Sequence, residues 1–406
     1  MKRFYLSAII LTVVALGCTK SSIVESATSY METIEFDSYA GRIPVTKASN
    51  TTIDTLKAHG FQAIAYNSGD YVETYLNETV TYDKTANNGE GKWTYGDKKI
   101  YWPEGSNLDF VAYGSNVNKT ATVSKEASVN LVSDFSEASF VYCVPDYVSE
   151  QEDLVVAAPW LNHNNKTETG NVVKFDFKHV LSKIGFNVVT NNEYTGENAN
   201  PVDVTIKNVR LRATMYNRGS VHLLATSPKV VPDLDSPITS YSLFDHNYPT
   251  KDASEYDESG MLKGFVCHNS TTSVPIYQNI KFNPENYAEV SVPSKDDEEA
   301  LNNRFMMILP AETIGKVRDI DDIDHDDNVN ENVPPYIEVV YQLTGGREEI
   351  VRAYLGDYGI TSFAAGKWYE FTFKVSTTAV KFDVNIKNDW SVPEELLKDD
   401  SGNDQV

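Results

Sequence analysis

A dense group of aspartates between positions 319 and 327 is the part of the chain that most resembles a metal site. Asp321, Asp324 and Asp326 are its candidate ligands, because calcium binds clustered carboxylate oxygens. The group lacks the central glycine and the distal glutamate that an EF-hand loop requires. Since runs of like charge are usually solvated loops, the sequence favours a solvated acidic loop and leaves calcium binding as the alternative.

Motifs typical of enzymes are missing from the sequence. It contains no His-Glu-x-x-His zinc motif, no Gly-x-Ser-x-Gly nucleophile motif and no Rossmann glycine fingerprint. The 7 histidines are scattered without the spacing of metal ligands. Carboxylate pairs are too common in so acidic a chain to identify a glycosidase dyad, whose separation the sequence does not give. We therefore expect no catalytic activity and no cofactor.

The first cysteine is a candidate for lipidation. Residues 1–17 begin with Lys2 and Arg3 and continue with an apolar run. That run is shorter than the roughly 20 residues of a membrane-spanning helix, so the pattern predicts a secretory signal peptide. Gly17 then precedes Cys18, as at a lipoprotein processing site, and Cys18 is predicted to be acylated. A plain signal peptide with an incidental cysteine is the alternative.

The other two cysteines, Cys143 and Cys267, form no Cys-x-x-Cys motif. This excludes a thioredoxin-like or zinc-ribbon signal. The two lie far apart in the sequence, so two separate buried thiols are favoured. Export also permits a disulfide, and that alternative stays open.

The composition is acidic and rich in aromatic residues. The chain has 406 residues and a formal net charge of −23. Such a surface repels phosphate backbones, so we expect no nucleic-acid binding. The 24 Tyr, 17 Phe and 5 Trp suit strands that are packed by aromatic side chains. The length exceeds one ordinary core and predicts two domains.

Apolar and polar residues alternate along much of the chain with the period of a β-strand. Clear examples lie at 173–177, 337–343 and 369–375, and turn residues separate such runs. Several short strands with regular turns indicate an all-β sandwich. One short helix is predicted at 51–59, where Gly60 can supply the left-handed stop.

The sequence predicts five parts. They are a signal peptide at 1–17, a lipid-anchored tether and first strand at 18–42, an N-terminal β-sandwich at 43–168, a C-terminal β-sandwich at 169–390 and an acidic mobile tail at 391–406. The polar stretch 162–170 sets the limit between the two sandwiches. The first strand is predicted at 33–39, with Ile34 and Phe36 on one face and polar residues on the other.

Three blocks of the sequence resemble the fimbrillin family, the pilins and Mfa-like proteins of type V pili. The blocks are LKAHGFQAIAY, IYWPEGSNLDFVAYG and FKHVLSKIGFNVV. They follow the lipoprotein signal in the family's order, and the resemblance covers most of the mature chain. It implies an all-β fold of two transthyretin-like β-sandwich domains in tandem, with one short helix near the start of the first.

The resemblance also implies a path of maturation. The precursor would travel as a lipoprotein to the outer membrane, where an arginine-specific protease would cut after the first strand. That strand would leave with the lipid, and Ile34 and Phe36 would be its apolar anchors. An extended segment of another fimbrial subunit would then fill the groove. The expected location is the cell surface, in a fimbria.

The expected cut lies between Arg42 and Ile43, because no other arginine occurs between Arg3 and Arg210. Cleavage at Arg42 is favoured over the alternative that it is an ordinary polar loop residue, and Lys47 is a weaker candidate for the cut. An arginine-specific protease would therefore meet one site in the first half of the chain.

The donated strand is less clearly indicated. Val380, Phe382, Val384 and Ile386 alternate as a donated strand requires, but they suit the last strand of their own domain equally well. The acidic tail beyond 390 has no such alternation, which puts a shaft role in doubt and leaves a tip or accessory role open. No receptor on a host or bacterial surface is indicated.

A glycan-binding surface lipoprotein is the second hypothesis, because exposed tyrosine and tryptophan rings can stack on sugars. A removable strand followed by a lone arginine separates the two hypotheses. A sugar-binding protein has no use for that arrangement.

Overall fold

The computed structural model describes residues 32–39, 53–115, 138–145, 148, 151–164, 171–190, 203–227, 229–235, 237–244, 265–268, 273–276, 305–316, 333–375 and 380–387. Within these residues the chain consists mostly of β-strands, with a single α-helix, α1 (Ile53–His59). The prediction of an all-β fold with one short early helix is confirmed. Cys18, the predicted cut at Arg42 and Ile43, and the calcium candidates Asp321, Asp324 and Asp326 lie outside the described residues.

The first half of the molecule is built on one large sheet. Its strands, in spatial order, are β1 (Glu35–Tyr39), β9 (Val172–His179), β7 (Leu154–Ala157), β5 (Leu108–Ser115), β2 (Phe61–Asn67), β3 (Asp70–Asp83) and β4 (Lys92–Tyr95), with β8 (Trp160–His163) paired to β5. Its neighbouring strands are antiparallel except β1 and β9, which are parallel. A 3-10 turn, η1 (Asn87–Gly89), joins β3 to β4.

The second half contains two five-stranded sheets and shares a small third sheet with the first half. One sheet has the order β16 (Val274–Pro275), β10 (Ser182–Val189), β20 (Trp368–Val375), β21 (Val380–Lys387), with β17 (Phe305–Ile308) on β10. The other has the order β14 (Pro237–Ser242), β11 (Asp203–Tyr216), β18 (Tyr336–Leu343), β19 (Glu348–Tyr354), with β15 (Phe265–His268) on β11. A short helix, η4 (Leu355–Tyr358), follows β19. The third sheet consists of β13 (Lys229–Pro232), β12 (Arg218–His222) and β6 (Ser139–Cys143).

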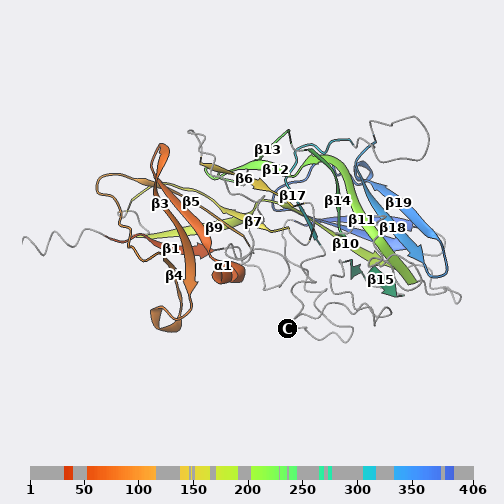
Figure 1. The fold of residues 1–406 in the computed structure, drawn as a ribbon, viewed down its shortest axis with the longest axis horizontal. Coiled ribbons are helices and arrows are strands. Elements are labelled where there is room, and N and C mark those ends of the chain that lie inside the picture. The colour runs from red at the N-terminus through yellow and green to blue at the C-terminus, as the bar shows by residue number, and fades with distance from the viewer. Residues whose placement is uncertain are drawn as a thin grey trace, which may run out of the picture.

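The two halves are joined by nearly continuous extended chain. β9 ends at His179 and β10 begins at Ser182, so one stretch passes from the first sheet into the second half. Figure 1 shows β1, β3, β4 and β5 at one end of an elongated molecule and β18 and β19 at the other. The sheets therefore change after β9, later than the predicted limit at 168. The polar stretch at 162–170 connects two strands of the first sheet, and composition alone does not distinguish such a loop from an interdomain linker.

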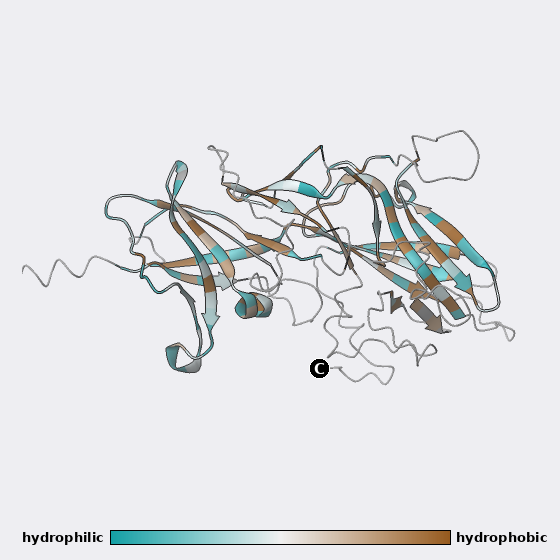
Figure 2. Ribbon diagram, viewed as in Figure 1, coloured by the Kyte–Doolittle hydropathy of each residue, from teal (hydrophilic) through white to brown (hydrophobic). Residues whose placement is uncertain are grey.

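Apolar side chains from the two faces of the first sheet enter different core clusters. On β2, Phe61, Ala63 and Ala65 belong to a cluster confined to the first half, whereas Ile64 and Tyr66 belong to a larger cluster that continues into the second half. The strands of both halves in Figure 2 carry bands of hydrophobic colour. Successive side chains of a strand point to opposite faces, so β2 supplies apolar side chains to the core clusters on both sides of the sheet.

The short helix α1 ends as its sequence predicts. Gly60 has φ 81°, and its N–H donates to the carbonyl of Leu56 at 2.6 Å. A Cβ at Gly60 would lie 2.5 Å from the carbonyl oxygen of Val80, so both the backbone angle and the close approach require glycine. The side chain of Leu56 is fully buried in the first-half cluster, which fixes the helix against the sheet.

The carboxylate of Asp109, on β5, ties three segments of the first sheet together. One oxygen accepts hydrogen bonds from Ser68 Oγ at 2.6 Å and from the Asn162 N–H at 2.6 Å. The other accepts from Tyr71 OH at 2.7 Å and from the Gly69 N–H at 3.2 Å. Burial by itself would raise the pKa of Asp109, but these bonds outweigh it and hold the pKa below its usual value. Burial and the bond to Asp109 raise the pKa of Tyr71 to about 12.

Candidate functional site

The first strand, β1, lies at the edge of the large sheet. It pairs in parallel with β9, in a register that places Phe36 beside Val173. The N–H of Glu35 donates to the carbonyl of Asn171 at 2.9 Å, and the side-chain amide of Asn171 donates to the carbonyl of Thr33 at 3.2 Å. The partner strand lies about 137 residues further along the chain, so sequence patterns gave no sign of this pairing.

The other side of the chain at 32–34 is held by the segment 100–102. The Ile34 N–H donates to the carbonyl of Ile100 at 2.9 Å, and the Trp102 N–H donates to the carbonyl of Glu32 at 3.0 Å. Tyr95 OH donates to the carbonyl of Ile34 at 2.8 Å. β1 itself pairs only with β9 among the described strands.

Ile34 and Phe36 are the buried side chains of this segment, as the alternation predicts. Their exposed fractions are 1% and 4%. The Phe36 ring stacks on Phe175 at 5.8 Å between centroids and meets Tyr95 and Phe110 edge-on at 5.3 and 6.4 Å. Burying each of the two side chains stabilises the strand by roughly 1.5–3 kcal/mol.

We call the surface that holds β1 the β1 seat. It consists of Tyr95, Ile100, Phe110, Asn171 and Phe175. Sequence analysis noted alternating aromatic residues but did not predict which of them meet. Removal of β1 would expose the aromatic rings of the seat and leave the facing edge of β9 unpaired, which is unfavourable in water.

The third position on the inward face of β1 is poorly matched to its surroundings. Ser38 follows Ile34 and Phe36 at the same spacing, and its hydroxyl oxygen is buried without a hydrogen-bond partner in the described part of the chain. A buried hydroxyl that lacks a partner costs about 1–3 kcal/mol. The inward face of β1 is therefore stabilised at Ile34 and Phe36 and destabilised at Ser38.

Replacing Ser38 with valine is expected to stabilise β1 in its seat by about 1 kcal/mol, because an apolar side chain removes the unpaired hydroxyl. Ser38 also lines an open pocket, which gives the added methyl groups room. Urea unfolding of the full chain measures the change. Ser38→Ala removes the hydroxyl without adding volume, so it should show the part of the gain that comes from losing the unpaired hydroxyl alone. If both variants are no more stable than the wild type, the hydroxyl of Ser38 does not weaken β1.

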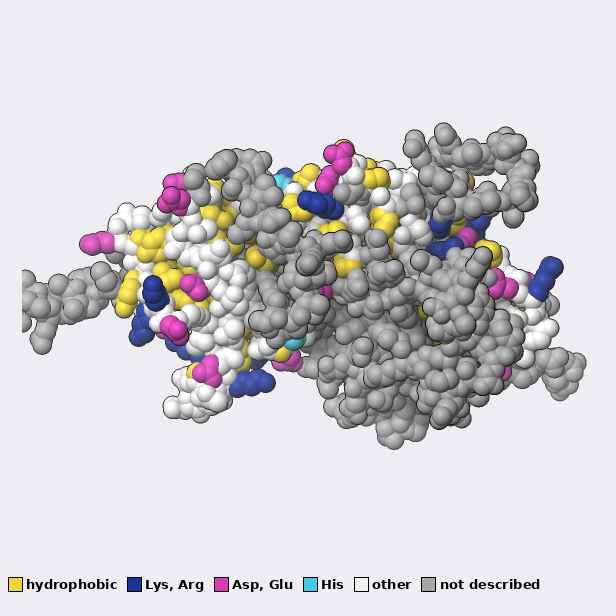
Figure 3. All heavy atoms as spheres, viewed as in Figure 1, with side chains coloured by type: hydrophobic (Ala, Val, Ile, Leu, Met, Phe, Trp, Pro, Cys, Tyr) yellow, Lys and Arg dark blue, Asp and Glu magenta, His cyan; other side chains and the backbone are white. Residues whose placement is uncertain are grey.

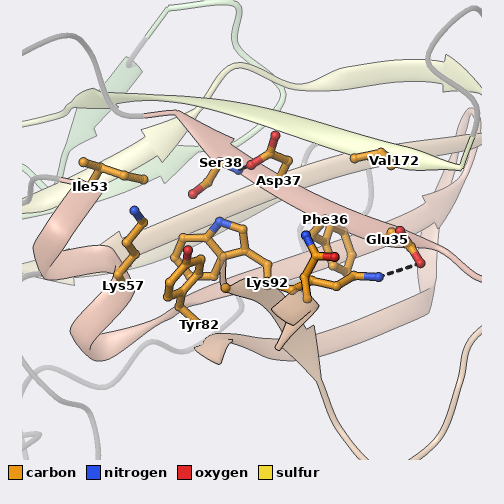
Figure 4. A pocket seen from close by; sticks show the side chains of 12 residues that line it. Glu35, Phe36, Asp37, Ser38, Ile53, Lys57, Tyr82, Lys92 and Val172 are labelled. Atoms are coloured by element: carbon orange, nitrogen blue, oxygen red, sulfur yellow. Dashed lines mark hydrogen bonds and ion pairs between the residues drawn. The ribbon is translucent and has the colours of Figure 1, made fainter. Parts of the chain in front are cut away.

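An open pocket of about 480 Å³ lies beside β1, between this strand, β4 and α1. Figure 4 shows Lys92 reaching across to Glu35, and the Nζ–Oε1 distance is 2.8 Å. Lys57 Nζ lies 4.8 Å from the centre of the Tyr82 ring on the same wall. The Lys92 side chain is 44% exposed, so its pair with Glu35 is a surface ion pair, worth about 1 kcal/mol or less.

The residues predicted for the donated strand lie in β21, which is paired with β20 as an edge strand of its own sheet. Phe382 packs on Phe373 at 5.3 Å between centroids, and Val380 and Val384 are half-buried against the larger core cluster. Ile386 is 48% exposed. Among the described residues β21 is the last strand of its own domain, one of the two alternatives that the alternation allowed.

No group of three or more His, Cys, Asp or Glu side chains with the arrangement of a metal site occurs among the described residues. The described part of the chain also has no helix of the length and apolarity that crossing a membrane requires. In that part Cys143, which is half-buried, and Cys267, which is buried, are not joined in a disulfide. On the face drawn in Figure 3, apolar side chains reach the surface between charged ones over the half that contains β1 to β5.

Comparison with known proteins identifies the family of the chain and solved structures with a similar fold. A family model described as Fimbrillin-like matches residues 46–390. A solved fimbrial protein from Bacteroides vulgatus is 16% identical, with a TM-score of 0.50 over 87% of this chain and 98% of that chain. A candidate cell adhesion protein from Bacteroides uniformis is 14% identical, with a TM-score of 0.41 over 88% and 97% of the two chains. No curated protein matches the sequence. The likeness to the first structure concerns the fold.

Proposed function

Because the chain belongs to the fimbrillin-like family, we propose that it is a structural, tip or accessory subunit of a type V fimbria that assembles by strand exchange. It is exported as a lipoprotein, acylated at Cys18 and carried to the outer membrane. An arginine-specific protease cuts between Arg42 and Ile43. β1 then leaves, and a strand of another fimbrial subunit takes its place.

The observation that carries this proposal is the way β1 is held. It is a short edge strand with two apolar anchors, Ile34 and Phe36, in a seat lined by aromatic rings. Loss of β1 leaves an apolar slot next to an unpaired strand edge, and both are satisfied by an extended segment with alternating apolar residues. The predicted cut follows β1 by three residues, since β1 ends at Tyr39.

Treatment of the purified precursor with an arginine-specific protease tests the proposal. The wild-type protein is expected to be cut after Arg42, to release the segment that contains β1 and to form oligomers, seen by mass spectrometry and size-exclusion chromatography. Arg42→Lys keeps the charge but removes the site, so this variant is expected to retain β1 and stay monomeric. A cut protein that loses β1, stays monomeric and shifts its mobility in a polysaccharide gel would overturn the proposal in favour of glycan binding.

A further inference from the structure

The β1 and β21 segments carry nearly the same pattern of residues. The chain reads Ile34-Glu35-Phe36-Asp37 in the first segment and Val380-Lys381-Phe382-Asp383 in the second. Both β1 and β21 are edge strands of their sheets, each paired with one neighbouring strand among the described residues. The apolar, aromatic and aspartate positions agree, and the second position has opposite charges.

A β21 segment placed in the orientation of β1 would satisfy the apolar part of the β1 seat. Phe382 would occupy the place of Phe36, between Phe110 and Phe175, and Val380 would occupy that of Ile34. Val384, two residues after Phe382, would take the place of Ser38, whose hydroxyl is buried without a partner among the described residues. By shape and hydrophobicity alone, β21 of a second copy would fit the seat better than β1 does.

The charge at the second position opposes that fit. Glu35 forms an ion pair with Lys92 at 2.8 Å, on the wall of the pocket beside β1. Lys381 in the same place would bring two ammonium groups together and leave Lys92 without its carboxylate. Like charges at this distance repel, although water and salt weaken the effect at a partly exposed site.

We propose that Lys92 selects the strand that replaces β1, admitting one with an acidic residue at the position of Glu35 and disfavouring β21 of an identical copy. The preferred occupant is an extended segment of a different subunit with the pattern apolar, acidic, Phe, any residue, apolar. This inference rests on the proposed strand exchange. Identical copies can still oligomerise through this site, but an acidic strand of a different subunit binds more tightly and so takes the place of β21, which gives the order of subunits a physical cause.

Peptide binding to the cut full-length protein tests the selection. Two fluorescent peptides are compared, one with the β21 sequence VKFDVNIK and one with Lys381→Glu in it, and their affinities are read by fluorescence anisotropy at low salt and at 1 M salt. The acidic peptide is expected to bind about three- to tenfold more tightly at low salt, the combined effect of one surface attraction gained and one repulsion removed. The preference should largely disappear at 1 M salt, where the screening length is about 3 Å.

Variants of Lys92 identify the group responsible. Lys92→Glu is expected to reverse the preference and Lys92→Ala to abolish it. Lys229→Glu makes the same change of net charge on the exposed surface of β13 in the other half and should leave the preference intact. Equal affinities for the two peptides in the wild-type protein, or a preference that survives in Lys92→Glu, would overturn the selection by Lys92 while leaving strand exchange standing. If neither peptide displaces β1, strand exchange itself is wrong and the selection fails with it.

Discussion

Replacing Phe36 with alanine is expected to destabilise the attachment of β1 by about 3–5 kcal/mol, the usual cost of deleting a buried phenylalanine ring. The ring contacts Phe175, Tyr95 and Phe110 and is almost fully buried, so a cavity would form at the centre of the seat. In the cut protein the same loss should speed release of β1 by about a hundredfold or more, since each 1.4 kcal/mol is a factor of ten.

Hydrogen exchange measures how much the attachment of β1 is weakened, because the Glu35 N–H donates to the carbonyl of Asn171 and should lose protection in the variant. Mass spectrometry over time after proteolysis measures how fast β1 is released. Tyr101→Ala is the control, since Tyr101 lies beside β1 but its side chain is 39% exposed; about 1 kcal/mol or less is expected there. Equal effects of the two substitutions would mean that Phe36 is not an anchor.

Replacing Asp109 with asparagine is expected to lower the free energy of unfolding by about 2–4 kcal/mol at neutral pH, because charge-assisted hydrogen bonds are lost. The amide can accept with only one of its two end groups, so two of the four donors now bonded to Asp109 would face a nitrogen. The turn between β2 and β3 and the start of β8 would loosen together. Urea unfolding followed by tryptophan fluorescence measures the change, with Asp97→Asn on the exposed surface as the matched control.

The difference between wild type and Asp109→Asn should depend on pH in a set direction. The hydrogen bonds hold the pKa of Asp109 below its unfolded value, about 3.9. Its contribution to stability is therefore complete above that value and is lost as the pH falls through the lowered folded-state pKa. The difference should be constant from pH 7 to about pH 5 and shrink below about pH 4. A difference that grows on acidification would contradict this assignment of the bonds.

Several features of the fold could be read from local sequence. The alternation at Ile34 and Phe36 predicted a strand with one buried face, and both side chains are buried. Gly60 predicted the end of α1, and its backbone has the expected left-handed angle. These predictions are correct because a period of two and a positive φ are properties of a few neighbouring residues.

The partners of those elements could not be read in the same way. Backbone hydrogen bonds are alike for all strands, so the sequence of β1 does not say that it pairs in parallel with β9. Local sequence also does not reveal the boundary between the halves. The polar residues after β8 were predicted to separate two domains, but β8 and β9 belong to one sheet. The same limit applies to Asp109, whose four donors come from the β2–β3 connection, the start of β3 and strand β8, which meet only in the folded chain.

The sequence by itself determined that this is a predominantly β protein of the fimbrillin-like family, with an early strand anchored by Ile34 and Phe36. Only the tertiary structure decided what that strand rests on, that Ser38 is its weak position and that Lys92 meets Glu35. It also decided that β21 completes its own sheet. The physical reason is that alternation fixes which side of a strand is apolar, whereas the residues that cover that side are brought together from distant parts of the chain by packing.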